Sequence, residues 1–586
     1  MLDERLGEIN MLLRLVLVVL VASMLGCAHG VSTDAVMVNE PVKEVPAVKN
    51  KQPESSKSQS SKLDAALLYS LLGGEVAGQR GDINMASAFY VEAARLSRDP
   101  EVALRAAQIA LYSKDIESAK SAIDIAVDSG GVSVQSRRLA LTIYLRSGDT
   151  KKSLSQIALM LEKSDIPQRN ALIAIGEIVA RHASKNVGIQ VVNELVKTYP
   201  DEAGIYLVRS KMMFQLKQWD NAEDDATVVT KLDPAWPVGF AQLSLVLESK
   251  GETERALSTL KSAGERLKAK QLMMGYGQLL AKNERYEAAK KEFLKLVSQE
   301  EGYPEASFAL GLVYLKLGDT TEAIGVFKGL YAVNGFSSQS AFYLGRIYYF
   351  QKAYQDALLW FGRVTKGVQY IDSQATTALI KSEMGDLQGA RSILQTLRNE
   401  YPENATRFYL LEAELLMDGR HNKVLYDLLN EAIKETPDDL ALRYARSIAA
   451  TELDDLTVAE KDLLFVLAKE PADVNALNAL GYTLASKTFR FKEARQYLTK
   501  ALSLRPNDSA ILDSMGWLNY REGHYEEALV LLQKAYQGSP EGEIAAHLGE
   551  ALWMLGRQKE ARQLWEEALK RDSDNKHLIE VLKRLQ

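Results

Sequence analysis

Hydrophobic residues after about position 63 follow the three- and four-residue spacing of helices, in runs too short for one long helix. Leu310 and Tyr314 lie one turn apart, and Ala323, Phe327 and Leu330 resume the same spacing after a break. Two amphipathic runs separated by a short break indicate two short helices that pack against each other. The sequence therefore predicts an all-α chain built from helix pairs.

Small residues and prolines in this region recur with a period of about 34 residues, as repeated structural units do. The glycines of this period include Gly277, Gly311 and Gly345, then Gly481, Gly516 and Gly549. The alanines include Ala222, Ala256, Ala289, Ala323, Ala357 and Ala390. The prolines include Pro402, Pro437, Pro471, Pro506 and Pro540. Three residue types in one phase predict one repeated unit.

Each unit is expected to turn between its two helices at a glycine followed by an acid. Gly318 permits the left-handed turn, and Asp319 with Glu322 has the spacing of a capping box for the second helix. The same pair of residue types recurs at Gly81, Gly148 and Gly385, and at Gly251 with Glu252 in place of aspartate.

These features resemble the tetratricopeptide repeat. The resemblance implies a superhelical solenoid of about fifteen helix pairs over residues 63–575, closed by a capping helix at 576–586. Stretches 101–165 and 405–471 lack the phased glycine, so the pattern predicts pairs there without fixing their edges. A capping helix is needed because each repeat buries its apolar face only against a neighbour.

The N-terminus is expected to carry a lipoprotein signal peptide, residues 1–26. Arg14 precedes eleven apolar-run residues from Leu15 to Leu25, too few for the roughly 20 that span a bilayer. The run ends at Cys27, the only cysteine of the chain, in a sequence that resembles a lipobox. Lipidation at Cys27 is the prediction, and an ordinary signal peptide with an incidental cysteine is the alternative. The acidic first residues suggest that translation starts at Met11.

Residues 27–62 are expected to form the lipidated cysteine and a disordered tether, because they are polar and lack a helical period. Ala28 follows the cysteine. By resemblance to Gram-negative lipoproteins, this residue implies an outer-membrane anchor with the body in the periplasm.

The charge of the chain and the motifs that it lacks exclude several classes of function. The net charge of −6 and the absence of a basic block argue against nucleic acid as a partner. The sequence has no phosphate-binding loop, nucleophile elbow or zinc motif, and its six histidines lie at unrelated phases of the repeat. We therefore predict no enzyme activity, no cofactor, no metal and no small-molecule substrate.

A partner protein is expected to dock on the concave face that first helices form in such solenoids. Residues near the phased glycine of a first helix are predicted to face it, and aromatic and arginine side chains are enriched at binding hot spots. The alternative is that these aromatics pack between repeats. The candidates are Phe342, Arg346, Tyr349, Asn478, Tyr482, Asp513, Trp517, Tyr520, Glu550 and Trp553.

Lipobox, tether and repeats together resemble outer-membrane adaptor lipoproteins that recruit a periplasmic C-terminal processing protease and its cell-wall hydrolase substrates. The expected function is therefore a membrane-anchored scaffold that binds proteins. An assembly factor for pili, secretion or exopolysaccharide export is the first alternative, and an enzyme is the second.

Overall fold

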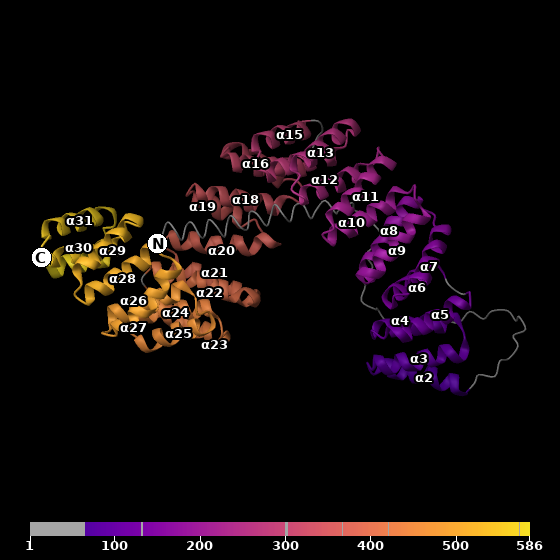
Figure 1. Ribbon diagram of the computed structural model, residues 1–586, viewed down its shortest axis with the longest axis horizontal. Coiled ribbons are helices and arrows are strands. Elements are labelled where there is room, and N and C mark those ends of the chain that lie inside the picture. The colour runs from indigo at the N-terminus through magenta and orange to yellow at the C-terminus, as the bar shows by residue number, and fades with distance from the viewer. Residues whose placement is uncertain are drawn as a thin grey trace, which may run out of the picture. The chain divides into compact units, whose positions relative to one another are not determined.

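The computed structural model describes residues 65–130, 133–298, 303–365, 367–419, 421–573 and 575–585. Within these ranges the chain folds into 31 α-helices, α2 to α32, with one short 3-10 helix and no strand. Cys27 and the tether lie outside the described residues. The fold is all-α, as the hydrophobic spacing predicts, and α2 to α31 make fifteen consecutive helix pairs (Figure 1).

The chain divides into two compact units, one ending at Ala323 and the other starting at Ile324. The helices of the first unit are α2 (Ala65–Gln79), α3 (Ile83–Ser97), α4 (Pro100–Tyr112), α5 (Ile116–Asp128), α6 (Val134–Ser147), α7 (Thr150–Glu162), α8 (Gln168–His182), α9 (Lys185–Thr198), α10 (Ala203–Gln215), α11 (Trp219–Leu232), α12 (Pro237–Ser249), α13 (Thr253–Leu267), α14 (Lys270–Lys282), α15 (Tyr286–Ser298) and α16 (Pro304–Leu317). Helix α17 (Thr320–Tyr331) contains the boundary.

The second unit holds the C-terminal repeats. Its helices are α18 (Ser337–Phe350), α19 (Tyr354–Phe361), α20 (Val368–Glu383), α21 (Leu387–Glu400), η2 (Pro402–Asn404), α22 (Ala405–Asp418), α23 (Asn422–Glu435), α24 (Leu440–Glu452), α25 (Leu456–Lys469), α26 (Val474–Lys487), α27 (Phe491–Leu504), α28 (Ser509–Arg521), α29 (Tyr525–Gly538), α30 (Gly542–Met554), α31 (Gln558–Arg571) and α32 (Lys576–Leu585).

The turns within pairs follow the predicted chemistry at most positions. Gly318 has a φ of +85°, and Asp82, Asp149 and Asp386 each accept a backbone N–H three residues ahead as helix N-caps. Glu252 makes no such cap. Its longer side chain pairs with Arg255 instead, so glutamate does not replace aspartate in this role.

Two stretches without the phased glycine also form complete pairs. In α4–α5 the turn residue is Lys114, with a φ of 63°, and in α24–α25 it is Asp454, with a φ of 57°. The turn between the two helices therefore stays left-handed even where its residue is not glycine, at the modest cost that a side chain adds in that conformation.

First helices line the inner side of each unit. The close backbone contacts of the described helices join each helix to the next or the next but one, and long side chains such as Tyr482 of α26 reach further along the first helices. Among next-but-one contacts, first helices such as α26 and α28 touch repeatedly along the chain, whereas second helices do so at only two places, α3–α5 and α7–α9. Helices that approach one another on one side mark the tighter, inner side, so the first helices form the concave face.

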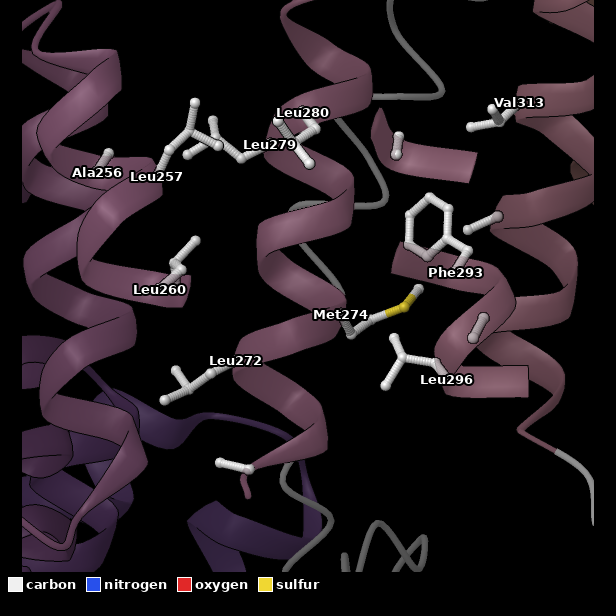
Figure 2. Close-up of a cluster of buried hydrophobic side chains, with 14 of the residues drawn as sticks. Ala256, Leu257, Leu260, Leu272, Met274, Leu279, Leu280, Phe293, Leu296 and Val313 are labelled. Atoms are coloured by element: carbon white, nitrogen blue, oxygen red, sulfur yellow. The ribbon is translucent and has the colours of Figure 1, made fainter. Parts of the chain in front are cut away.

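The apolar core runs between consecutive helices rather than around one centre. Figure 2 shows one section, where Leu257 and Leu260 of α13 face α14, and Phe293 of α15 lies beside Met274 of α14. Phe293 is completely buried. Each pair thus fills its interface with its neighbours, which makes the stability of a repeat a local property.

Candidate functional site

The phased glycines fix the direction of the neighbouring side chains on the first helices. A Cβ atom on Gly516 would lie 2.7 Å from Leu532 of α29, and one on Gly549 would collide with Trp565 of α31. These glycine faces are therefore pressed against the second helix. Trp517 and Glu550 follow the glycines by one residue, so they point about 100° away from that contact, toward the inner face.

The helices α26, α28, α30 and α32 bring polar and aromatic residues together on the inner face of the last repeats. We call this group the C-terminal inner-face cluster. Its members are Asn478, Tyr482, Asp513, Trp517, Tyr520, Glu543, His547, Glu550, His577 and Arg584.

A buried histidine–aspartate pair lies at the centre of the cluster. Nδ1 of His547 is 3.0 Å from both carboxylate oxygens of Asp513, and both residues are buried. Burial opposes a charge on His547, but the carboxylates of Asp513, Glu543 and Glu550 together outweigh it and raise the pKa of the histidine. The imidazole therefore stays protonated more readily than a free one.

Aromatic rings surround this pair. Trp517 stacks on His547 with ring centroids 4.1 Å apart and on Tyr520 with centroids 4.7 Å apart. The Tyr482 hydroxyl donates to Glu543 at 2.7 Å. Ring stacking of this kind fixes each side chain in one orientation.

The closing helix α32 contributes two basic side chains to the cluster. Arg584 forms an ion pair with Glu550, and Nε2 of His577 lies 3.7 Å from Glu543. The Tyr520 hydroxyl also faces Glu550, and burial first, then Glu550, raises the pKa of that phenol. The carboxylates of α30, Glu543 and Glu550, are thus approached by side chains from α28 on one side and from α32 on the other.

Three polar atoms in the cluster are buried without a hydrogen-bond partner in the described part of the protein. They are Oδ1 of Asn478, Nε1 of Trp517 and Oε2 of Glu550. They come from three successive first helices, α26, α28 and α30. Two are acceptors and one is a donor, which is the combination that a peptide main chain can satisfy.

The structure places the other sequence candidates apart from this group. Trp553 stacks on Trp565 of its own second helix, with centroids 5.9 Å apart, and Arg562 covers its ring. Trp553 therefore contacts the outer helix α31 and does not share the contacts of Trp517.

Phe342, Arg346 and Tyr349 form a separate group on α18. The Arg346 guanidinium lies over the rings of Phe342 and Phe350, at 5.6 and 5.8 Å. Burial lowers the pKa of Arg346. The Tyr349 hydroxyl donates to Glu383 of α20 at 3.1 Å.

Several members of the cluster were not among the sequence candidates, namely Glu543, His547, His577 and Arg584. Each belongs to a pair separated by 34 residues, such as Asp513 with His547 or Glu550 with Arg584. One repeat length places two residues at the same height of neighbouring first helices. Acidic and basic residues 34 positions apart were therefore the sequence feature from which these members of the cluster could have been predicted.

The cluster offers hydrogen-bonding, charged and aromatic side chains. Within the described ranges no three His, Cys, Asp or Glu residues are grouped as metal ligands. In the described residues, the hydrogen bonds of the His547 imidazole go to the Asp513 carboxylate and not to a hydroxyl or thiol nucleophile. No described helix is long and apolar enough to cross a membrane.

A chain of stacked helix pairs with a polar inner face defines a helical-repeat protein. Family models described as tetratricopeptide repeat match residues 276–340, 308–367, 376–404, 474–508 and 520–585. The TPR repeat-containing protein PA4667 of Pseudomonas aeruginosa is 33% identical over 487 residues, which is 82% of each chain. The chain belongs to the tetratricopeptide-repeat family.

More distant proteins match as well. The TPR repeat-containing protein MJ1428 of Methanocaldococcus jannaschii is 23% identical over 56% of this chain and 62% of that protein. The solved structure of the APC/C hetero-tetramer Cut9–Hcn1 is 15% identical and covers 88% of this chain and 89% of that one, with a TM-score of 0.33. Membership of the family makes this protein a scaffold for protein–protein interactions.

Proposed function

We propose that this protein is a lipid-anchored adaptor of the bacterial envelope that holds partner proteins on its inner face. The observation that carries the proposal is the set of three unpartnered atoms on α26, α28 and α30. A buried polar atom without a partner costs about 1–3 kcal/mol. A peptide segment that supplies the missing donors and acceptor removes this cost, so the inner face favours a bound main chain.

The partners we propose are a periplasmic C-terminal processing protease and its cell-wall hydrolase substrates. Cys27 in its lipobox-like sequence and the polar stretch up to residue 62 support an outer-membrane anchor with a flexible tether. Fifteen helix pairs offer room for two partners at once, and simultaneous binding raises their effective concentration. The adaptor itself has no catalytic role in this proposal.

Site-specific photocrosslinking in intact envelopes tests the proposal. A photoreactive phenylalanine analogue replaces Tyr520 on the inner face or, as the matched control, Val530 on the outer helix α29. Val530 is 67% exposed, so the analogue is accessible there without disturbing the core. We expect a protease or its substrate to be crosslinked at position 520 and not at position 530.

Two results would contradict the proposal. Equal crosslinking at both positions would show that the inner face is not the binding surface. Crosslinking at position 520 to pilus, secretion or export components, with no protease among the products, would replace the protease adaptor by an assembly factor.

A further inference from the structure

The C-terminal inner-face cluster carries an excess of negative charge close to its unpartnered atoms. Asp513, Glu543 and Glu550 lie on α28 and α30, and Asp513 and Glu550 are only 6% and 5% exposed. His547 compensates Asp513 and Arg584 pairs with Glu550, whereas His577 beside Glu543 has a pKa lowered by burial and compensates that carboxylate less. Buried carboxylates favour a cationic partner and disfavour an anionic one.

Glu550 is the carboxylate that is incompletely paired. Its Oε1 accepts from Arg584, but its Oε2 is buried and has no hydrogen-bond partner among the described residues. A carboxylate can accept several hydrogen bonds and can take a guanidinium through both oxygens. Glu550 therefore has capacity for a further cation.

Arg584 is a loosely held partner for this carboxylate. Its side chain is 56% exposed. The helix that carries it is held in place by other residues, because Leu578 and Val581 are buried in the last apolar cluster. α32 therefore has apolar attachments besides the ion pair with Glu550, so an exchange of the Arg584 guanidinium for another cation would not by itself detach the helix.

Aromatic rings next to Glu550 suit the same kind of ligand. Trp517 and Tyr520 are stacked nearly parallel, at 11°, and Tyr520 also faces Glu550. Cations are attracted to aromatic rings, and their apolar stems pack along them. Trp517 is already stacked on His547 and Tyr520, so the apolar stem of a lysine or arginine side chain that reaches Glu550 would pack beside these rings.

We propose that the cluster binds a peptide segment through a lysine or arginine side chain received by Glu550, and that Arg584 is an intramolecular competitor for this carboxylate. The proposal rests on the proposed function, and it adds the charge of the segment that the adaptor recognises. A partner's cation takes the place of Arg584, while its main chain meets Asn478 and Trp517.

Fluorescence anisotropy with the full-length protein tests this, using labelled short peptides of one apolar and small-residue scaffold. Their central residue is arginine, glutamine or glutamate. We expect the arginine peptide to bind at least about tenfold more tightly than the glutamine peptide, since burial strengthens a paired charge. The glutamate peptide should bind least.

Two variants that break the same ion pair distinguish recognition from a structural role. Glu550→Gln should weaken binding of the arginine peptide by about tenfold. Arg584→Gln should strengthen it, because the competitor is removed. Glu560→Gln, which breaks the Arg557–Glu560 pair on the outer helix α31, is the control and should change nothing.

The outcomes that overturn the proposal are separate from those that overturn the adaptor. If Glu550→Gln and Arg584→Gln shift the affinity in the same direction, the ion pair is structural. If arginine and glutamine peptides bind equally and Trp517→Ala abolishes both, the inner face binds peptides but does not select a cation. If no peptide binds the wild type, cation recognition fails, whereas the crosslinking at position 520 still decides the adaptor.

Discussion

At the scale of single residues, two histidines of the same cluster have opposite electrostatic surroundings. His547 is fully enclosed and faces Asp513, Glu543 and Glu550, so its pKa is raised despite burial. His577 is more accessible, and burial lowers its pKa against the attraction of Glu543. The two rings lie 6.4 Å apart. Protonation of one therefore does not imply protonation of the other.

This difference predicts opposite pH dependences of stability. The folded state favours protonated His547, so its contribution is fully present below the ordinary pKa of about 6.5. That contribution is lost as the pH rises through the raised pKa. The folded state favours neutral His577, so its contribution is present above about pH 6.5 and is lost as the pH falls through the lowered pKa.

Urea unfolding of the wild type, His547→Gln and His577→Gln over a range of pH measures this. The stability difference between wild type and His547→Gln should grow as the pH falls, and the difference for His577→Gln should shrink. Parallel curves for the two variants would show that Asp513 does not hold a proton on His547.

At the scale of helices, the sequence predicted which segments form helix pairs. It largely failed to predict which side chains the neighbouring first helices bring together. The spacing of the phased glycines identified the first helices correctly. A glycine is needed at these positions because the first helix packs closely against the second helix there. Pairs without the phased glycine, such as α4–α5, were predicted only by period, and the turn residue gives no signal there either, because Lys114 adopts the left-handed conformation without being glycine.

The inner-face candidates show where sequence reasoning ends. Trp517 and Trp553 are both large aromatics near a phased glycine, yet they contact different helices, Trp517 along the inner face and Trp553 on α31. The position one residue after the glycine points inward, whereas the position four residues after it lies near the turn to the second helix. Tyr520 contacts Tyr525 at such a turn. Tyr520 and Trp553 both follow a phased glycine by four residues, yet Tyr520 stacks on Trp517 and Trp553 stacks on Trp565, so phase alone does not separate these two.

Glycine substitutions in two neighbouring helix pairs should change stability in opposite directions. A Cβ on Gly345 of α18 would lie 2.6 Å from Cδ1 of Phe361, which is completely buried and has no room to move. Gly345→Ala should therefore cost about 1–3 kcal/mol of unfolding free energy. Gly329→Ala is the control, because nothing lies within 4 Å of that Cβ on α17. It should stabilise its helix by up to about 1 kcal/mol.

Hydrogen exchange of both variants shows where each effect acts. Faster exchange in Gly345→Ala should be confined to α18, α19 and their neighbours, as nearest-neighbour coupling requires. Equal stability of the two variants would mean that α18 and α19 can separate to admit a methyl group without loss.

At the scale of the whole molecule, the proposed function assigns a binding surface to the repeats and a membrane anchor to the N-terminal segment. Each repeat is stabilised by its neighbours, so a long array tolerates local variation such as the charged cluster in the last repeats. An adaptor gains most from such an array when it is concentrated at one surface together with its partners. The anchor is therefore as important to the proposed function as the inner face.

The anchor predicts that Cys27→Ser releases the protein from the membrane. The apolar run before Cys27 is too short to span a bilayer, so without lipid nothing in that segment is expected to hold the chain there. A fully lipidated cysteine carries more than one acyl chain, which stable anchoring requires. Sedimentation of envelopes followed by immunoblotting should find the variant in the soluble fraction and the wild type with outer membranes. Ser23→Ala is the control: it changes the same segment but leaves Cys27 available for lipidation, so this variant should remain with the membranes. A Cys27→Ser protein that still sediments would place the anchor elsewhere.

The predicted translation start is tested separately by mass spectrometry of the N-terminus. A peptide that contains Asp3 would exclude translation from Met11.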